Sequence, residues 1–141
     1  MTKPKSKQAK RILICGDRNW TDKQLIREVL LEHLNPEVDF IIHGDARGAD
    51  RLGAEVAQEL GVSVDHVLAF PADWNQYHRA AGPIRNQQML TEGKPTLVLA
   101  FHNCITTSKG TKDMICKALK AGLPVYLNGD RRLTKIAYNL V

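Results

Sequence analysis

The stretch IIHGDARGAD, residues 41–50, joins an apolar segment to the first turn of a predicted helix. A simple connector needs one glycine or one capping residue, but this one holds two glycines, two aspartates and an arginine. Gly44 and Gly48 allow the backbone to turn sharply and to approach a ligand closely. Arg47 offers a fork of donors that suits a phosphate or a carboxylate. We therefore predict an anion-binding loop at the start of this helix.

Strand and helix patterns alternate on both sides of this stretch. Apolar runs that end in glycine or proline are typical of strands buried on both faces, and they occupy residues 12–16, 38–43, 62–70, 96–101 and 124–127. Helical spacing of apolar residues predicts helices over residues 21–34, 48–60 and 111–121, the first capped by Thr21. Residues 76–92 are predicted to form a helix or an irregular crossover, whose first part Gly82-Pro83 interrupts. Residues 131–141 are predicted to form either a closing strand or a packed tail.

This alternation predicts the α/β class, with a single Rossmann-like three-layer domain over residues 11–141. A parallel sheet of about five strands with right-handed crossovers is expected, in the order 3-2-1-4-5. Five of the cations behind the net charge of +5 lie in the first eleven residues, and the rest of the chain holds 15 basic and 15 acidic residues. Residues 1–10 are therefore predicted to be a flexible basic tail on a neutral body.

The composition excludes several protein classes. No apolar run approaches the roughly 20 residues of a membrane span, and the polar N-terminus lacks the apolar core of a secretory signal. Three scattered cysteines without a C-x-x-C pair favour free thiols and a cytoplasmic location. The motifs GxGxxG and GxxxxGK[ST] are absent, and no set of side chains at metal-ligand spacing predicts a metal site.

Ligands of an open α/β sheet bind beyond the carboxyl ends of the strands, where the strand order reverses. In the predicted order this crevice lies between the first and fourth strands, so the loops after Gly16, Gly44, Phe70 and Phe101 surround it. The opposite edge carries plain stop signals such as LNPE and GLP. The predicted ligand-binding residues are Gly16, Asp17, Arg18, Trp20, Gly44, Asp45, Arg47, Gly48, Asp50, Asp73, Trp74, Arg79, Arg85, Asn86, Ser108, Lys109, Gly110 and Thr111.

Purely structural roles are open for several of these residues. The alternatives are that Asp50 pairs with Arg47 or Arg51, that Arg18 pairs with Asp17 or Asp45, that Ser108 and Thr111 cap a helix, and that Trp20 and Trp74 cover the crevice wall instead of stacking on a base.

Five motifs occur in an order that resembles a known family: GDRNW (16–20), HGDARGAD (43–50), FPADW (70–74), AAGPIRNQQM (80–89) and GTKDM (110–114). Together they resemble the YspA-type branch of the SLOG superfamily, a branch that occurs in bacteria and phages, over about residues 11–127. The resemblance implies a pocket for a nucleotide or a nucleotide derivative. The superfamily includes the lonely-guy phosphoribohydrolases, DNA-processing proteins of the DprA type, and sensor domains for signals related to NAD or ADP-ribose.

The hydrolase motif of the lonely-guy enzymes is only partly matched. Their PGGxGTxxE corresponds to TTSKGTKDM, in which Gly110 and Thr111 match and Met114 stands at the catalytic glutamate. The resemblance implies one catalytic candidate, Arg85, which is similar to their catalytic arginine. Two carboxylates, at residues 17 and 45, replace the small residues more usual in the branch. Neighbouring arginines, a bound Mg²⁺ or ribose hydroxyls would each satisfy them.

The leading hypothesis is a protein that binds a nucleotide or a nucleotide-derived ligand of the nucleoside phosphate, NAD or ADP-ribose type, with no certain cofactor. The alternative is a hydrolase that cleaves the N-glycosidic bond of such a ligand. A DNA-associated protein of the DprA type is the third hypothesis, against which the neutral body argues. No membrane partner is expected, and the resemblance allows a homo-oligomer.

Overall fold

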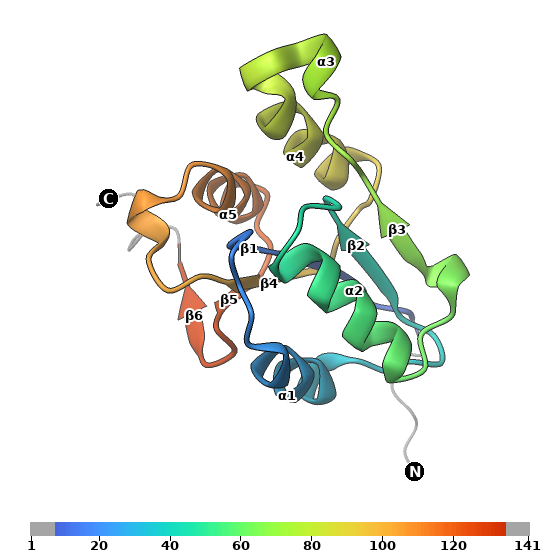
Figure 1. The fold of residues 1–141 in the computed structure, drawn as a ribbon. Helices are drawn as coiled ribbons and strands as arrows, with labels where there is room; N and C mark the ends of the chain where they lie inside the picture. The colour runs from blue at the N-terminus through green and yellow to red at the C-terminus, as the bar shows by residue number, and fades with distance from the viewer. Residues whose placement is uncertain (1–7, 135–141) are drawn as a thin grey trace.

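Six strands form one sheet in the order β3-β2-β1-β4-β5-β6 (Figure 1). The computed structural model describes residues 8–134. The strands are β1 (Arg11–Gly16), β2 (Phe40–His43), β3 (Val67–Ala69), β4 (Leu97–Phe101), β5 (Val125–Leu127) and β6 (Arg131–Leu133). The first five run parallel, which confirms the predicted order, and β6 pairs antiparallel with β5. A closing strand therefore follows β5 at residues 131–133.

Helices cover both faces of the sheet, as the three-layer prediction requires (Figure 1). They are α1 (Lys23–His33), α2 (Ala49–Glu59), α3 (Trp74–Tyr77), α4 (Ala81–Thr91) and α5 (Gly110–Lys120), with the 3₁₀ turns η1 (Val64–His66), η2 (His78–Ala80) and η3 (Ile105–Thr107). Successive side chains of β1 point to opposite faces. Ile12 and Ile14 pack with α1 and α2, whereas Leu13 and Cys15 pack with α4 and α5. Residues 12–15 of this strand are all apolar because both of its faces are buried.

Local boundaries differ from the sequence pattern in three places. Asp22, and not Thr21, caps α1, because its carboxylate accepts the Leu25 N–H at 3.0 Å. Gly82-Pro83 does not interrupt the crossover helix but lies in the first turn of α4, where a missing proline N–H costs no helical hydrogen bond. The second and third strands begin later than predicted, and residues 64–66 before β3 form η1.

The start of the described chain is anchored to the domain. Asp39 is fully buried, and it accepts the backbone N–H groups of Lys10 and Asn35, each at 2.8 Å. The Lys10 ammonium lies 3.0 Å from the same carboxylate, so this residue belongs to the folded body and not to a free tail. Residues 1–7 of the predicted tail, and residues 135–141, lie outside the described residues. Within residues 8–134, no helix is long and apolar enough to cross a membrane.

Candidate functional site

The carboxyl ends of the parallel strands open into one continuous cleft. It consists of an inner pocket of about 320 Å³ and an outer cleft of about 1090 Å³. The two cavities share five residues, namely Arg18, Ala46, Arg85, Lys109 and Gly110. Arg18, Arg47 and Lys109, which come from three loops far apart in the sequence, all line the outer cleft. The loops converge at the edge where a parallel sheet of this order forms binding sites.

Positive charge dominates the outer cleft. One carboxylate lines it, that of Asp45, against six cations: Arg18, Arg47, Arg51, Arg79, Arg85 and Lys109. Among residues 8–134, no carboxylate lies within ion-pair distance of Arg18, Arg79 or Lys109. Arg18 therefore does not pair with Asp17 or Asp45. This uncompensated charge gives the cleft a positive potential that attracts anions.

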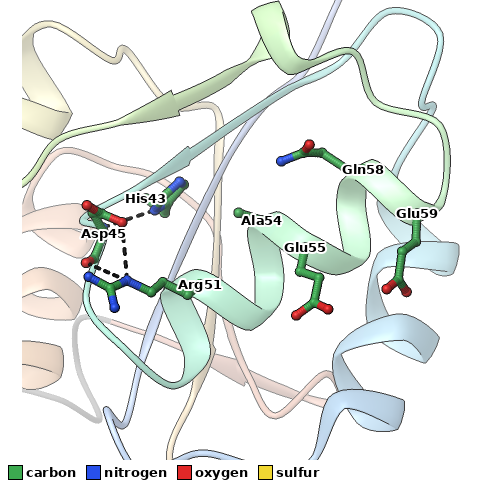
Figure 2. A pocket seen from close by; sticks show the side chains of 7 residues that line it. All are labelled: His43, Asp45, Arg51, Ala54, Glu55, Gln58 and Glu59. Atoms are coloured by element: carbon green, nitrogen blue, oxygen red, sulfur yellow. Dashed lines mark hydrogen bonds and ion pairs between the residues drawn. The ribbon is translucent and has the colours of Figure 1, made fainter.

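The one acid of the outer cleft is already paired. Asp45 adopts the left-handed backbone conformation, with φ of 59°, which aspartate tolerates better than most residues. Its carboxylate lies 3.3 Å from Arg51 Nε. Figure 2 shows this pair beside His43, at one end of a shallow side groove of about 520 Å³ along α2. His43 Nδ1 accepts the Asp45 N–H, and burial lowers the pKa of this histidine, so a neutral ring supports the loop.

The loop of residues 44–48, between β2 and α2, is held together by Asp50. Its side chain is buried, and Oδ2 accepts the N–H groups of Gly44 at 3.0 Å and Ala46 at 3.3 Å. It forms no ion pair with Arg47 or Arg51, so the structural alternative of a surface pair does not hold. Gly48 has a φ of 80°, and a side chain there would overlap the backbone of Asp17. The loop after β2 therefore packs directly on the loop after β1.

The helix that follows this loop is less open than predicted. The Ala49 N–H donates to Asp17 O at 3.1 Å, so one of the first donors of α2 is used within the protein. Gly48 precedes α2 without a side-chain cap and lies outside the lining of both cavities. The side chains of the loop, more than this helix terminus, face the ligand space.

Burial raises the pKa of Asp50 to about 6, while the hydrogen bonds from Ala46 and Gly44 and the charge of Arg85 oppose the shift. A carboxyl whose pKa is raised in the folded state stabilises the fold below its unfolded pKa, and this contribution is lost as pH rises through the folded pKa.

We expect the Asp50→Asn variant to remove that pH dependence. From about pH 4 to pH 7, the wild-type unfolding free energy should fall by about 3 kcal/mol relative to the variant, the linkage value for this pKa shift. Urea unfolding of both proteins across this range measures the difference. A constant difference would mean that Asp50 does not titrate there, or titrates equally in the unfolded chain.

Arg85 and Asn86 tie the loops of the site to α4. The Arg85 guanidinium donates to Gly44 O and to Phe70 O, and its Nε donates to Asn86 Oδ1 at 3.0 Å. The buried Asn86 amide then donates to Gly110 O at 3.2 Å and to Asp113 Oδ2 at 3.0 Å. Both residues line the inner pocket, and Arg85 also lines the outer cleft.

The start of α5 combines a cap with open lining residues. Ser108 Oγ accepts the Thr111 N–H at 3.0 Å, so the capping alternative holds for this serine. Thr111 is buried in the lining of the inner pocket. A Cβ added to Gly110 would meet no atom within 4 Å, so open space lies in front of this residue. Lys109 and Gly110 present the ligand-facing surface of this segment.

Two predicted binding residues besides Gly48 lie outside the cleft, namely Trp20 and Asp73. Trp20 is buried in the core against Phe101, with ring centroids 5.8 Å apart, and its indole N–H donates to Asp22 O. Asp73 caps α3 by accepting the Gln76 N–H at 3.1 Å. Neither lines the inner pocket or the outer cleft, so the structure does not bring them to the predicted site. Both side chains instead contact other parts of the fold.

The structure adds lining residues that the sequence prediction missed. The inner pocket is also lined by Cys15, Asn19, Ala46, Met89, His102 and Met114. His102 follows β4 directly, as Asp17 follows β1, and these strands pair with Gly16 opposite Phe101. The position of His102 directly after a predicted strand was the sequence feature that could have identified it as a lining residue. Within the part of the chain that the structure describes, no group of three or more His, Cys, Asp or Glu side chains is placed to hold a metal ion.

Comparisons with known proteins agree with this architecture. Residues 10–77 match the model of the YAcAr family, described as the YspA, cpYpsA-related SLOG family. The chain is also 35% identical over 127 residues to the Gene 61 protein of Mycobacterium phage D29, and the match covers 86% of this chain and 98% of that protein. The chain therefore belongs to the YspA, cpYpsA-related SLOG family.

Proposed function

We propose that this protein binds a nucleotide or a nucleotide-derived ligand in the cleft, with its phosphate groups in the outer cleft. The observation that carries the proposal is the excess of cations there, of which Arg18, Arg79 and Lys109 form no ion pair with a described carboxylate. Guanidinium and ammonium groups are the common protein partners of phosphate. Membership of a SLOG family supports a nucleotide-related function.

An aromatic surface at the rim supplies a place for the base. Trp74 is 51% exposed, lines the outer cleft and lies over Gly82, where an added Cβ would be 3.5 Å from the ring. Arg79 lines the cleft beside it. Indole rings stack well on flat heterocycles, so the base of a phosphate-anchored nucleotide would stack on Trp74.

The chemistry of the inner pocket favours binding without turnover. Met114 stands at the position of the hydrolase glutamate, and its buried side chain lines the pocket. Asp113, the next carboxylate on α5, accepts from Asn86 and from Lys117 Nζ at 2.6 Å. No acid of α5 is thus directed to a substrate, as N-glycosidic cleavage by the lonely-guy route would need.

A thermal-shift panel tests the proposal. The purified chain is heated with AMP, ATP, NAD, ADP-ribose and a single-stranded oligonucleotide, and each hit is chromatographed after incubation. We expect a higher melting temperature with at least one mononucleotide or dinucleotide and an unchanged ligand peak. A free-base peak would instead support the N-glycosidic hydrolase, and a shift with the oligonucleotide alone would support a DNA partner. A folded sample that responds to none of these ligands would contradict the proposal.

A further inference from the structure

The inner pocket differs from the outer cleft in the groups that it presents. Asp17, at the end of β1, has a side chain that is 33% exposed and lines the pocket. Its Oδ1 accepts the Asn19 N–H at 2.9 Å. Its Oδ2 lies 4.0 Å from His102 Nε2 and has no shorter contact with a cationic side chain in the described residues. The pocket thus offers a carboxylate with unused acceptor capacity.

The neighbouring histidine, His102, approaches this carboxylate through Nε2 at 4.0 Å, which is too long for a hydrogen bond. His102 Nδ1 accepts the Cys104 N–H at 2.9 Å, so the proton of the neutral ring lies on Nε2, the nitrogen that faces Asp17. The backbone N–H of His102 in turn donates to Asn128 Oδ1, which fixes the backbone at this residue. The two side chains therefore place a carboxylate acceptor and a ring nitrogen beside each other in the pocket lining.

An unpaired carboxylate disfavours phosphate beside it, because like charges repel at short range. It favours a neutral group that is rich in donors, and the vicinal hydroxyls of a ribose are such a group. The second pocket carboxylate, Asp50, is already satisfied by two backbone N–H groups. Asp17 is therefore the group that selects what enters the inner pocket.

We propose that the inner pocket holds the ribose of the ligand, with its 2′- and 3′-hydroxyls donating to Asp17 and its phosphate directed outward to Arg18 and Lys109. The inference rests on the proposed function and adds the orientation of the ligand and a preference for ribonucleotides. The pocket, at about 320 Å³, is at the small end of ligand sites. Arg18 and Lys109 line both cavities, so a phosphate at their junction contacts both.

Calorimetric titrations with AMP, 2′,3′-dideoxy-AMP and inorganic pyrophosphate test this orientation, in EDTA and again with Mg²⁺. Wild-type protein should bind AMP at least roughly 10-fold more tightly than the dideoxy analogue, the value of hydrogen bonds to a charged acceptor. Asp17→Asn keeps the shape of the side chain and should remove most of that preference. Its affinities for the dideoxy analogue and for pyrophosphate should stay the same or increase.

Asp65→Asn is the matched control, because Asp65 lies in η1 on the opposite edge of the sheet; it should change none of the affinities. Wild-type protein that binds AMP and dideoxy-AMP equally would overturn the inference and leave the proposed function standing. A preference for AMP that appears only with Mg²⁺ and is lost in Asp17→Asn would assign the carboxylate to the metal instead, and would also overturn it. Failure of wild-type protein to bind any of the three probes would overturn the inference, and the proposed function would fall with it only if NAD, ADP-ribose and ATP also fail to bind.

Discussion

The Arg85→Met variant is expected to unfold with about 2–3 kcal/mol less free energy than the wild type at pH 7, because hydrogen bonds from a charged donor contribute about 1.5–3 kcal/mol each and Arg85 is only partly buried. Arg85 donates to the carbonyls of Gly44 and Phe70, and its charge stabilises the buried carboxylate of Asp50. Methionine fills a similar volume but offers no donor. The variant removes the positive charge that favours the ionised form of the buried Asp50, and it leaves two backbone acceptors without this donor.

Urea unfolding monitored by fluorescence measures this loss, and a second substitution identifies its cause. Adding Asp50→Asn to the Arg85→Met protein should recover part of the stability, because the uncompensated buried charge is then gone. Arg79→Met is the matched control, since no hydrogen bond or ion pair of its side chain occurs within residues 8–134; it should change stability by less than about 0.5 kcal/mol. Strictly additive effects of the Arg85 and Asp50 substitutions would contradict the coupling.

The fold was predictable because it depends on patterns within the chain. Apolar runs and helical spacing gave the order β3-β2-β1-β4-β5, and the strand ends of that order brought Arg18, Arg47 and Lys109 to one cleft. Such convergence follows from the geometry of parallel strands alone. Element boundaries were less accurate, since caps and turns depend on single side chains such as Asp22.

The roles of individual site residues depended on contacts that sequence spacing does not contain. Trp20 follows β1 closely, yet its ring turns into the core against Phe101. The sequence allows Asp50 to pair with a neighbouring arginine. In the structure the loop folds back, and the backbone N–H groups of Gly44 and Ala46 donate to its carboxylate instead. Asp73 is an exception, because an aspartate three residues before Gln76 at the start of a helix is a recognisable cap.

Removal of two cations from the cleft tests how the ligand is attracted. The Arg18→Ala, Lys109→Ala double variant is expected to bind the best mononucleotide of the panel roughly 100-fold more weakly. Each charge-assisted hydrogen bond to phosphate contributes about 1.5–3 kcal/mol, and both side chains are exposed, so solvent screening reduces that value. Neither side chain supports the fold through an ion pair with a described residue, so the melting temperature without ligand should change little.

The salt dependence of ligand affinity shows whether the double variant loses electrostatic attraction or has a cleft of altered shape. Wild-type affinity should fall as salt concentration rises, and the fall should be smaller in the double variant, because fewer charges remain to be screened. Lys120→Ala removes one positive charge at the far end of α5, away from the cleft, and should keep wild-type affinity. A double variant that binds within about threefold of the wild type would place the phosphate elsewhere, since charge-assisted contacts of this kind cannot be lost at so small a cost.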